Sequence, residues 1–91
     1  MSAMAGETLA ELRATYDWRI SRALARLEAA LRAAALATAA YDRCRDQPGS
    51  DPIVIADLRE ARFLAEVKAA AGRYEYDALQ DQAALDVGRP R

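Results

Sequence analysis

A single interruption divides this chain into two long segments that both favour helix. It is the sequence Arg-Asp-Gln-Pro-Gly-Ser-Asp-Pro-Ile, which runs from Arg45 to Ile53. Pro48 and Gly49 end a helix, because proline lacks a backbone N–H and glycine readily adopts the left-handed turn that follows a helix end. Asp51 and Pro52 begin the next helix as its N-cap and first residue. Two helices folded back on one tight turn are therefore expected.

The expected fold is all-α. It is a single helical-hairpin domain over residues 1–91, in which two long antiparallel helices pair in a coiled-coil-like manner. Thr8 and Glu11 have the spacing of a capping box at the start of the first helix, and Gly88 and Pro90 end the second. The predicted segments are a helix over 8–46, a turn over 47–51 and a helix over 52–87, with frayed ends at 1–6 and 89–91.

Apolar residues recur at steps of three and four along both segments, which predicts the faces through which the helices pair. In the first helix this face comprises Leu9, Leu12, Tyr16, Ile20, Leu24, Leu27, Leu31, Ala34, Thr38 and Tyr41. In the second it comprises Val54, Leu58, Ala61, Leu64, Val67, Ala71, Tyr74 and Ala78. A second, rotated set on the same helix comprises Phe63, Ala70, Tyr76, Leu79 and Ala83. Two apolar stripes on one helix predict contact with more than one neighbour.

The composition predicts a hairpin of marginal stability. Apolar residues make up 53% of the chain, but 23 of them are alanine, whose side chain buries little surface. Ordering each residue costs about 1–2 kcal/mol of backbone entropy. Small scaffolds of this kind gain stability from oligomerisation or from a partner. We therefore expect a protein partner or a homo-oligomer to complete the fold.

The residue types present exclude most chemistry. The chain has no histidine, which removes the commonest general base and nearly every transition-metal site. Its lone cysteine, Cys44, lies between two arginines at a helix end and is interpreted as a small semi-buried residue rather than a catalytic thiol. No catalytic, cofactor-binding or metal-binding residue is assigned, and no enzyme is expected.

Charge and hydropathy indicate where such a protein acts. The net charge of −1 argues against general nucleic-acid binding, and no apolar segment is long enough to insert into a membrane. A lone thiol and the lack of a basic and apolar leader predict a cytoplasmic location. Residues 12–45 carry a net charge of +4 and residues 51–86 one of −4. This difference favours antiparallel pairing of the two helices and disfavours pairing of like helices. The alternative is that the charges form two ordinarily solvated faces.

Five residues are the candidate partner-binding side chains. Trp18 and Arg22 lie toward the open end of the hairpin, beside a stripe of further arginines at 19 and 26. Phe63, Tyr76 and Leu79 belong to the second stripe of the second helix. Tryptophan and arginine are enriched at the energetic centres of interfaces. The alternatives are packing in the core for Trp18 and a solvated outer face for the arginines.

The segment Q-P-G-S-D-P-I-V-I-A-D-L-R (Gln47–Arg59) resembles the interhelix turn of type III secretion needle subunits, which are short helical hairpins. The segment R-Y-E-Y-D-A-L (Arg73–Leu79) is similar to the small hairpin co-chaperones of the same systems. The resemblance implies a hairpin that assembles or is chaperoned, and it carries over no functional residue. The expected function is a non-enzymatic protein–protein interaction module, an adaptor or small chaperone subunit. The alternative is a self-assembling structural subunit of an oligomer or filament.

Overall fold

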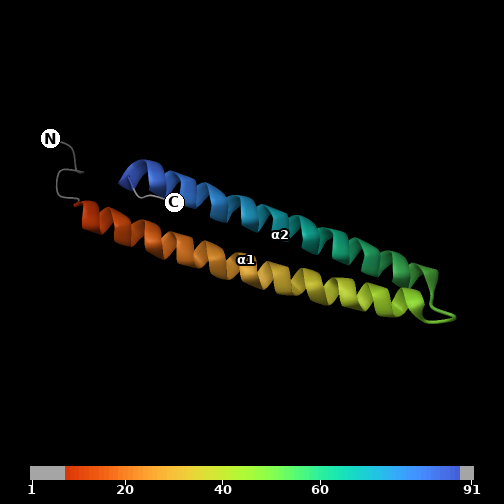
Figure 1. The fold of residues 1–91 in the computed structure, drawn as a ribbon. Coiled ribbons are helices and arrows are strands. Elements are labelled where there is room, and N and C mark those ends of the chain that lie inside the picture. The colour runs from red at the N-terminus through yellow and green to blue at the C-terminus, as the bar shows by residue number, and fades with distance from the viewer. Residues whose placement is uncertain (1–7, 89–91) are drawn as a thin grey trace.

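The computed structural model describes residues 8–88 and shows two helices packed side by side (Figure 1). Helix α1 spans Leu9–Asp46 and helix α2 spans Pro52–Val87. The helices are antiparallel, so the start of α1 and the end of α2 lie together at the open end of the hairpin. The molecule is a rod with extents of 70 × 24 × 15 Å. The predicted all-α hairpin is confirmed.

The ends of both helices carry the caps that the sequence predicts. The Thr8 hydroxyl accepts a hydrogen bond from the Glu11 N–H, and the Glu11 carboxylate accepts one from the Thr8 N–H, both at 3.1 Å. Gly88 ends α2 with φ of +68°, in the left-handed region that favours glycine. The frayed ends predicted at 1–6 and 89–91, together with Pro90, lie outside the described residues.

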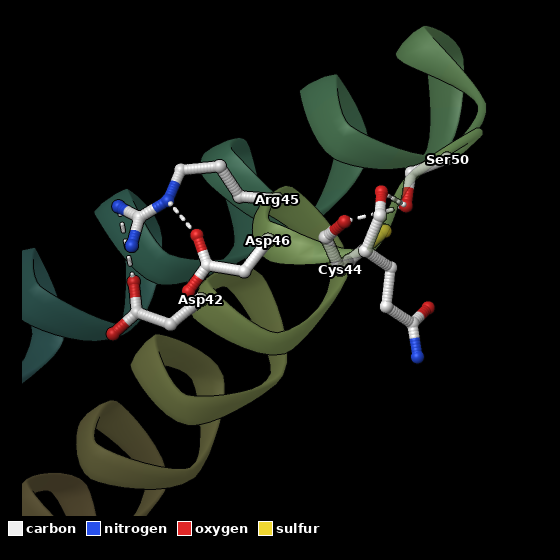
Figure 2. A network of polar contacts seen from close by, with 6 residues as sticks. Asp42, Cys44, Arg45, Asp46 and Ser50 are labelled. Carbon is white, nitrogen blue, oxygen red and sulfur yellow. Dashed lines mark hydrogen bonds and ion pairs between the residues drawn. The ribbon is translucent and has the colours of Figure 1, made fainter.

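The turn between the helices is held by side-chain hydrogen bonds (Figure 2). The Ser50 hydroxyl contacts the carbonyl of Cys44 at 2.5 Å and that of Gln47 at 3.0 Å, at the end of α1. Gly49 has φ of +79°, and the Asp51 carboxylate accepts from the Ile53 N–H at 2.9 Å. The same two carbonyls accept longer backbone bonds, from the Gln47 N–H at 3.3 Å and the Ser50 N–H at 3.4 Å, so the Ser50 hydroxyl adds to the satisfaction of the helix end.

The helices face each other along a seam, defined here as the buried and half-buried residues that line their contact. On α1 the seam comprises Leu12, Tyr16, Ile20, Ala23, Leu27, Ala30, Ala34, Ala37, Thr38 and Tyr41. The prediction was right for seven of its ten positions and wrong for three leucines. Leu9, Leu24 and Leu31 are exposed, and Ala23 and Ala30, which precede the last two, are buried instead.

On α2 the predicted pairing face was wrong. The seam comprises Ile55, Leu58, Arg62, Ala65, Ala69, Gly72, Tyr76, Leu79, Ala83 and Val87. Of the predicted face only Leu58 is in this set, while Val54, Leu64, Val67 and Tyr74 are exposed. The second, rotated stripe is split between two environments. Tyr76, Leu79 and Ala83 face α1, whereas Phe63 and Ala70 are exposed.

The sizes of the facing residues explain this register. Leu27 of α1 is only 4% exposed and packs on Gly72 of α2, where an added Cβ would lie 3.5 Å from the Leu27 Cα. At the open end, the buried Tyr16 packs with Ala83 and Val87. Small residues on α2 thus receive large side chains from α1, which brings the helix axes close together. Large residues on both sides would hold the axes apart.

Candidate functional site

One apolar feature of the surface is a stripe along α2, here called the outer face. It comprises Leu64, Val67, Ala71, Tyr74 and Ala78, all exposed and spaced by three and four residues. Val67 is 50% exposed and Tyr74 is 78% exposed. This spacing keeps all five residues on one side of the helix over about four turns. The outer face is thus a continuous apolar surface of the isolated hairpin.

The outer face points away from α1. Val67 lies two residues from Ala65 and from Ala69, and both of these belong to the seam. Two residues correspond to a rotation of about 200° around an α-helix. Tyr74 has the same relation to the seam residues Gly72 and Tyr76. A neighbour that covered the outer face would therefore form a third layer on the far side of α2.

A second feature is an open pocket of about 270 Å³ between the two helices. It is here called the Trp18 pocket, and it is lined by Trp18, Arg19, Arg22, Arg26, Glu75 and Leu79. Helix α1 contributes the indole and the three arginines. Positions 18, 22 and 26 lie one above another on the helix, and position 19 lies beside them. Helix α2 contributes the carboxylate and an aliphatic side chain. Trp18 is 62% exposed, so the indole is available to a ligand.

Each arginine of the Trp18 pocket contacts an aromatic or acidic neighbour. The Arg22 guanidinium lies 5.1 Å from the centre of the Trp18 ring, and that of Arg19 lies 5.6 Å from the centre of the Tyr16 ring. Both distances are within the range of cation–π attraction. Arg26 donates to a single oxygen of Glu75 from Nη2 at 2.6 Å and from Nε at 3.2 Å. This ion pair bridges α1 and α2 at the pocket wall.

A hydrogen bond joins the two helices at the open end of the hairpin, and its residue on α1 lies two positions before Trp18. The Tyr16 hydroxyl donates a hydrogen bond to the Asp86 carboxylate, which also accepts one from the Gln82 amide at 2.9 Å. The bond to Asp86 and burial raise the pKa of Tyr16 above its ordinary value. The bonds from Tyr16 and Gln82 lower the pKa of Asp86. The hydrogen bond therefore favours the neutral form of Tyr16 and the ionised form of Asp86.

The structure brings together some of the five candidate residues but not all. Trp18, Arg22 and Leu79 line the Trp18 pocket. Tyr76 is half-buried in the seam, and its hydroxyl accepts a hydrogen bond from the Gln80 amide at 2.8 Å. Phe63 is exposed and lies beside the outer face, about 24 Å along the helix from Leu79 at 1.5 Å per residue. The candidates thus fall in three places: the Trp18 pocket, the seam and a position beside the outer face.

Leu64, Val67 and Tyr74 were missed as surface residues because they were assigned to the intramolecular seam. Two series with three–four spacing run along α2, and periodicity alone does not say which of them meets α1. The signal that distinguishes them is residue size. The series that contains Ala65, Ala69 and Gly72 is the one that lets a second backbone approach closely.

Other kinds of site have little support within residues 8–88. No group of three or more residues among the described cysteines, aspartates and glutamates is placed to hold a metal ion. Neither of the two helices is both long enough and apolar enough to span a bilayer. Comparison with known proteins gives no match to a family model, to a curated protein or to a solved structure. The outer face and the Trp18 pocket are therefore the two candidate sites, and both suit binding.

Proposed function

We propose that this chain is a non-enzymatic helical hairpin that binds another protein through the outer face of α2. The observation that carries the proposal is the exposure of Leu64, Val67 and Tyr74 on one continuous side of the helix. Burying apolar surface is worth about 25 cal/mol per Å², and the hairpin itself leaves this surface in water. A partner that covers it gains that free energy without rearranging the seam.

The shape of the outer face defines the partner that fits it. Apolar residues at positions i, i+3, i+7 and i+10 are the pattern by which a helix lies in a groove or packs on another helix. The partner is thus a helical or grooved protein, and the chain acts as its adaptor or small chaperone subunit. The resemblance of residues 47–59 to needle subunits favours a component of a secretion apparatus. The lone Cys44 favours the cytoplasm as the place of binding.

The alternative function is self-assembly through the same face, and the charge difference between the helices favours it. Helix α1 carries seven arginines against five carboxylates, whereas α2 carries seven carboxylates against four basic residues. The outer face of one copy would therefore meet α1 of the next copy. A contact between two different surfaces is heterologous, and it generates a ring or a filament.

Photo-crosslinking tests the proposal. A photoreactive amino acid is placed in living cells at Val67, on the outer face, and at Leu36, which is 72% exposed on α1. We expect one crosslinked protein from position 67 and none from position 36. Mass spectrometry of the product separates the two functions, because a partner gives foreign peptides whereas self-assembly gives peptides of this chain.

The identified partner is then purified, and its affinity for Val67→Asp and for Leu36→Asp is measured. A charge in the centre of an apolar contact should weaken binding by at least about tenfold, and the control should bind as the native chain does. Equal crosslinking from the two positions, or native affinity of Val67→Asp, would contradict the proposal.

A further inference from the structure

The Trp18 pocket is separate from the outer face, and its chemistry specifies a ligand. We propose that it binds an acidic segment of the partner protein, with carboxylates on Arg19 and Arg22 and an apolar side chain against Trp18 and Leu79. This inference rests on the proposed function, since the segment belongs to the partner. The Trp18 pocket would be a second contact with the partner, and its lining predicts that this part of the partner is acidic.

The charge of the pocket is the first reason. Three guanidinium groups and one carboxylate line it. Arg26 is already paired with Glu75 at 2.6 Å, so the pocket keeps a positive excess that comes from Arg19 and Arg22. Guanidinium groups bind carboxylates through two parallel N–H donors. An incoming acidic side chain can thus pair with either arginine.

The geometry of the two arginines is the second reason. Each guanidinium lies over an aromatic ring, Arg19 over Tyr16 and Arg22 over Trp18. Cation–π attraction at these distances, 5.6 Å for Arg19 and 5.1 Å for Arg22, favours one position of each guanidinium. Less side-chain entropy is then lost when a carboxylate binds. The arginines are therefore held in place before the ligand arrives.

The apolar lining is the third reason, and it selects a peptide over a bare anion. The exposed indole of Trp18 and the half-buried Leu79 give the pocket a surface on which an aliphatic side chain can pack. A long polyanion such as a nucleic acid fits poorly, because it would run on over the carboxylates of Glu75 and Asp86, which lie on the same side of α2. A short acidic segment with an apolar residue satisfies both parts of the pocket.

The test uses a blocked, dye-labelled Glu-Glu-Leu-Glu-Glu peptide and fluorescence anisotropy on the full chain. We expect binding that weakens as ionic strength rises, because exposed charge pairs are screened by salt. Trp18→Ala and Arg22→Gln should each weaken binding by about tenfold, the usual effect of losing a charge-assisted hydrogen bond or an aromatic anchor. Arg32→Gln is the matched control, since Arg32 is exposed on α1 outside the pocket, and it should bind as the native chain does.

Three results would overturn the inference. They are equal binding of the matching Gln-Gln-Leu-Gln-Gln peptide, native affinity of Arg22→Gln, and tighter binding of inorganic phosphate or of a short single-stranded oligonucleotide. Circular dichroism checks that each variant keeps its helices. Val67→Asp should bind the peptide normally, because Val67 lies on the outer face. The failure of this inference is thus distinguishable from the failure of the proposed function.

Discussion

At the scale of single residues, the hydrogen bond between Tyr16 and Asp86 fastens the open end of the hairpin. The Tyr16 ring is buried against Ala83 and Val87, and its hydroxyl reaches a carboxylate on the other helix. Because this end has no connecting turn, a cross-helix bond here opposes fraying of both helices. Its strength depends on pH, since it favours ionised Asp86 and neutral Tyr16.

We predict that Tyr16→Phe is less stable than the native chain near neutral pH and that this difference shrinks in acid. The pKa of Asp86 is lowered in the folded state, so its stabilising effect is present above the ordinary aspartate pKa and is lost as the pH falls through the folded value. Urea unfolding followed by circular dichroism at about pH 6 and about pH 3, on either side of the ordinary aspartate pKa, measures it. A difference that is the same at both pH values would contradict the role of this bond.

Gly72 is the second residue with a definite consequence. An added Cβ there would lie 3.5 Å from the Leu27 Cα and 3.6 Å from its Cδ1, which is ordinary van der Waals contact. Gly72→Ala should therefore fit and stabilise the chain by about 0.5–1 kcal/mol through helix propensity. Gly72→Leu should destabilise it, because a larger side chain pushes α1 away. Thermal melts of both variants measure their stability relative to the native chain. A loss of stability in Gly72→Ala would mean that the two helices are closer at this position than the structure shows.

At the scale of the elements, we predict that the turn contributes to stability rather than to binding. Ser50→Ala removes the bonds from the Ser50 hydroxyl to the carbonyls of Cys44 and Gln47. The expected loss is about 1 kcal/mol in the free energy of unfolding, with no change in partner affinity. Ser21→Ala, at an exposed position on α1, is the control and should lose nothing. Weaker partner binding by Ser50→Ala would place part of the interface at the turn.

The helix ends were predictable from the sequence because they depend on local chemistry. Thr8, Asp51 and Gly88 act within a few residues of their own position, so the sequence alone indicates their roles. Tyr16, Ile20 and Leu27 were also placed correctly in the seam.

The facing side of α2 was not predictable from spacing, because it depends on what α1 presents. Leu64 and Val67 have the spacing of a seam, but Gly72 and Ala69 allow Leu27 to come closer. The Trp18 pocket was anticipated only in part. Its arginine stripe is local to α1, whereas Glu75 comes from the other helix.

At the scale of the whole molecule, the hairpin has little core for its length. The buried residues of the described chain are Tyr16, Ala23, Leu27, Ala30, Ala69, Ala83 and Val87. Among the described residues, no large side chain is completely shielded from solvent. Such a rod gains stability whenever another surface covers it. The outer face is where we propose that such a surface fits.

The most direct test compares the free energies of unfolding of Val67→Asp, Ala69→Asp and Leu36→Asp, measured with urea on the purified chain at low concentration. Val67 and Leu36 are exposed, so these two variants should each lose no more than about 1 kcal/mol, largely through helix propensity. Ala69 is buried in the seam, so a carboxylate there should cost more than about 2 kcal/mol. If Val67→Asp unfolds the hairpin as Ala69→Asp does, Val67 belongs to the core and the outer face is not free to bind a partner.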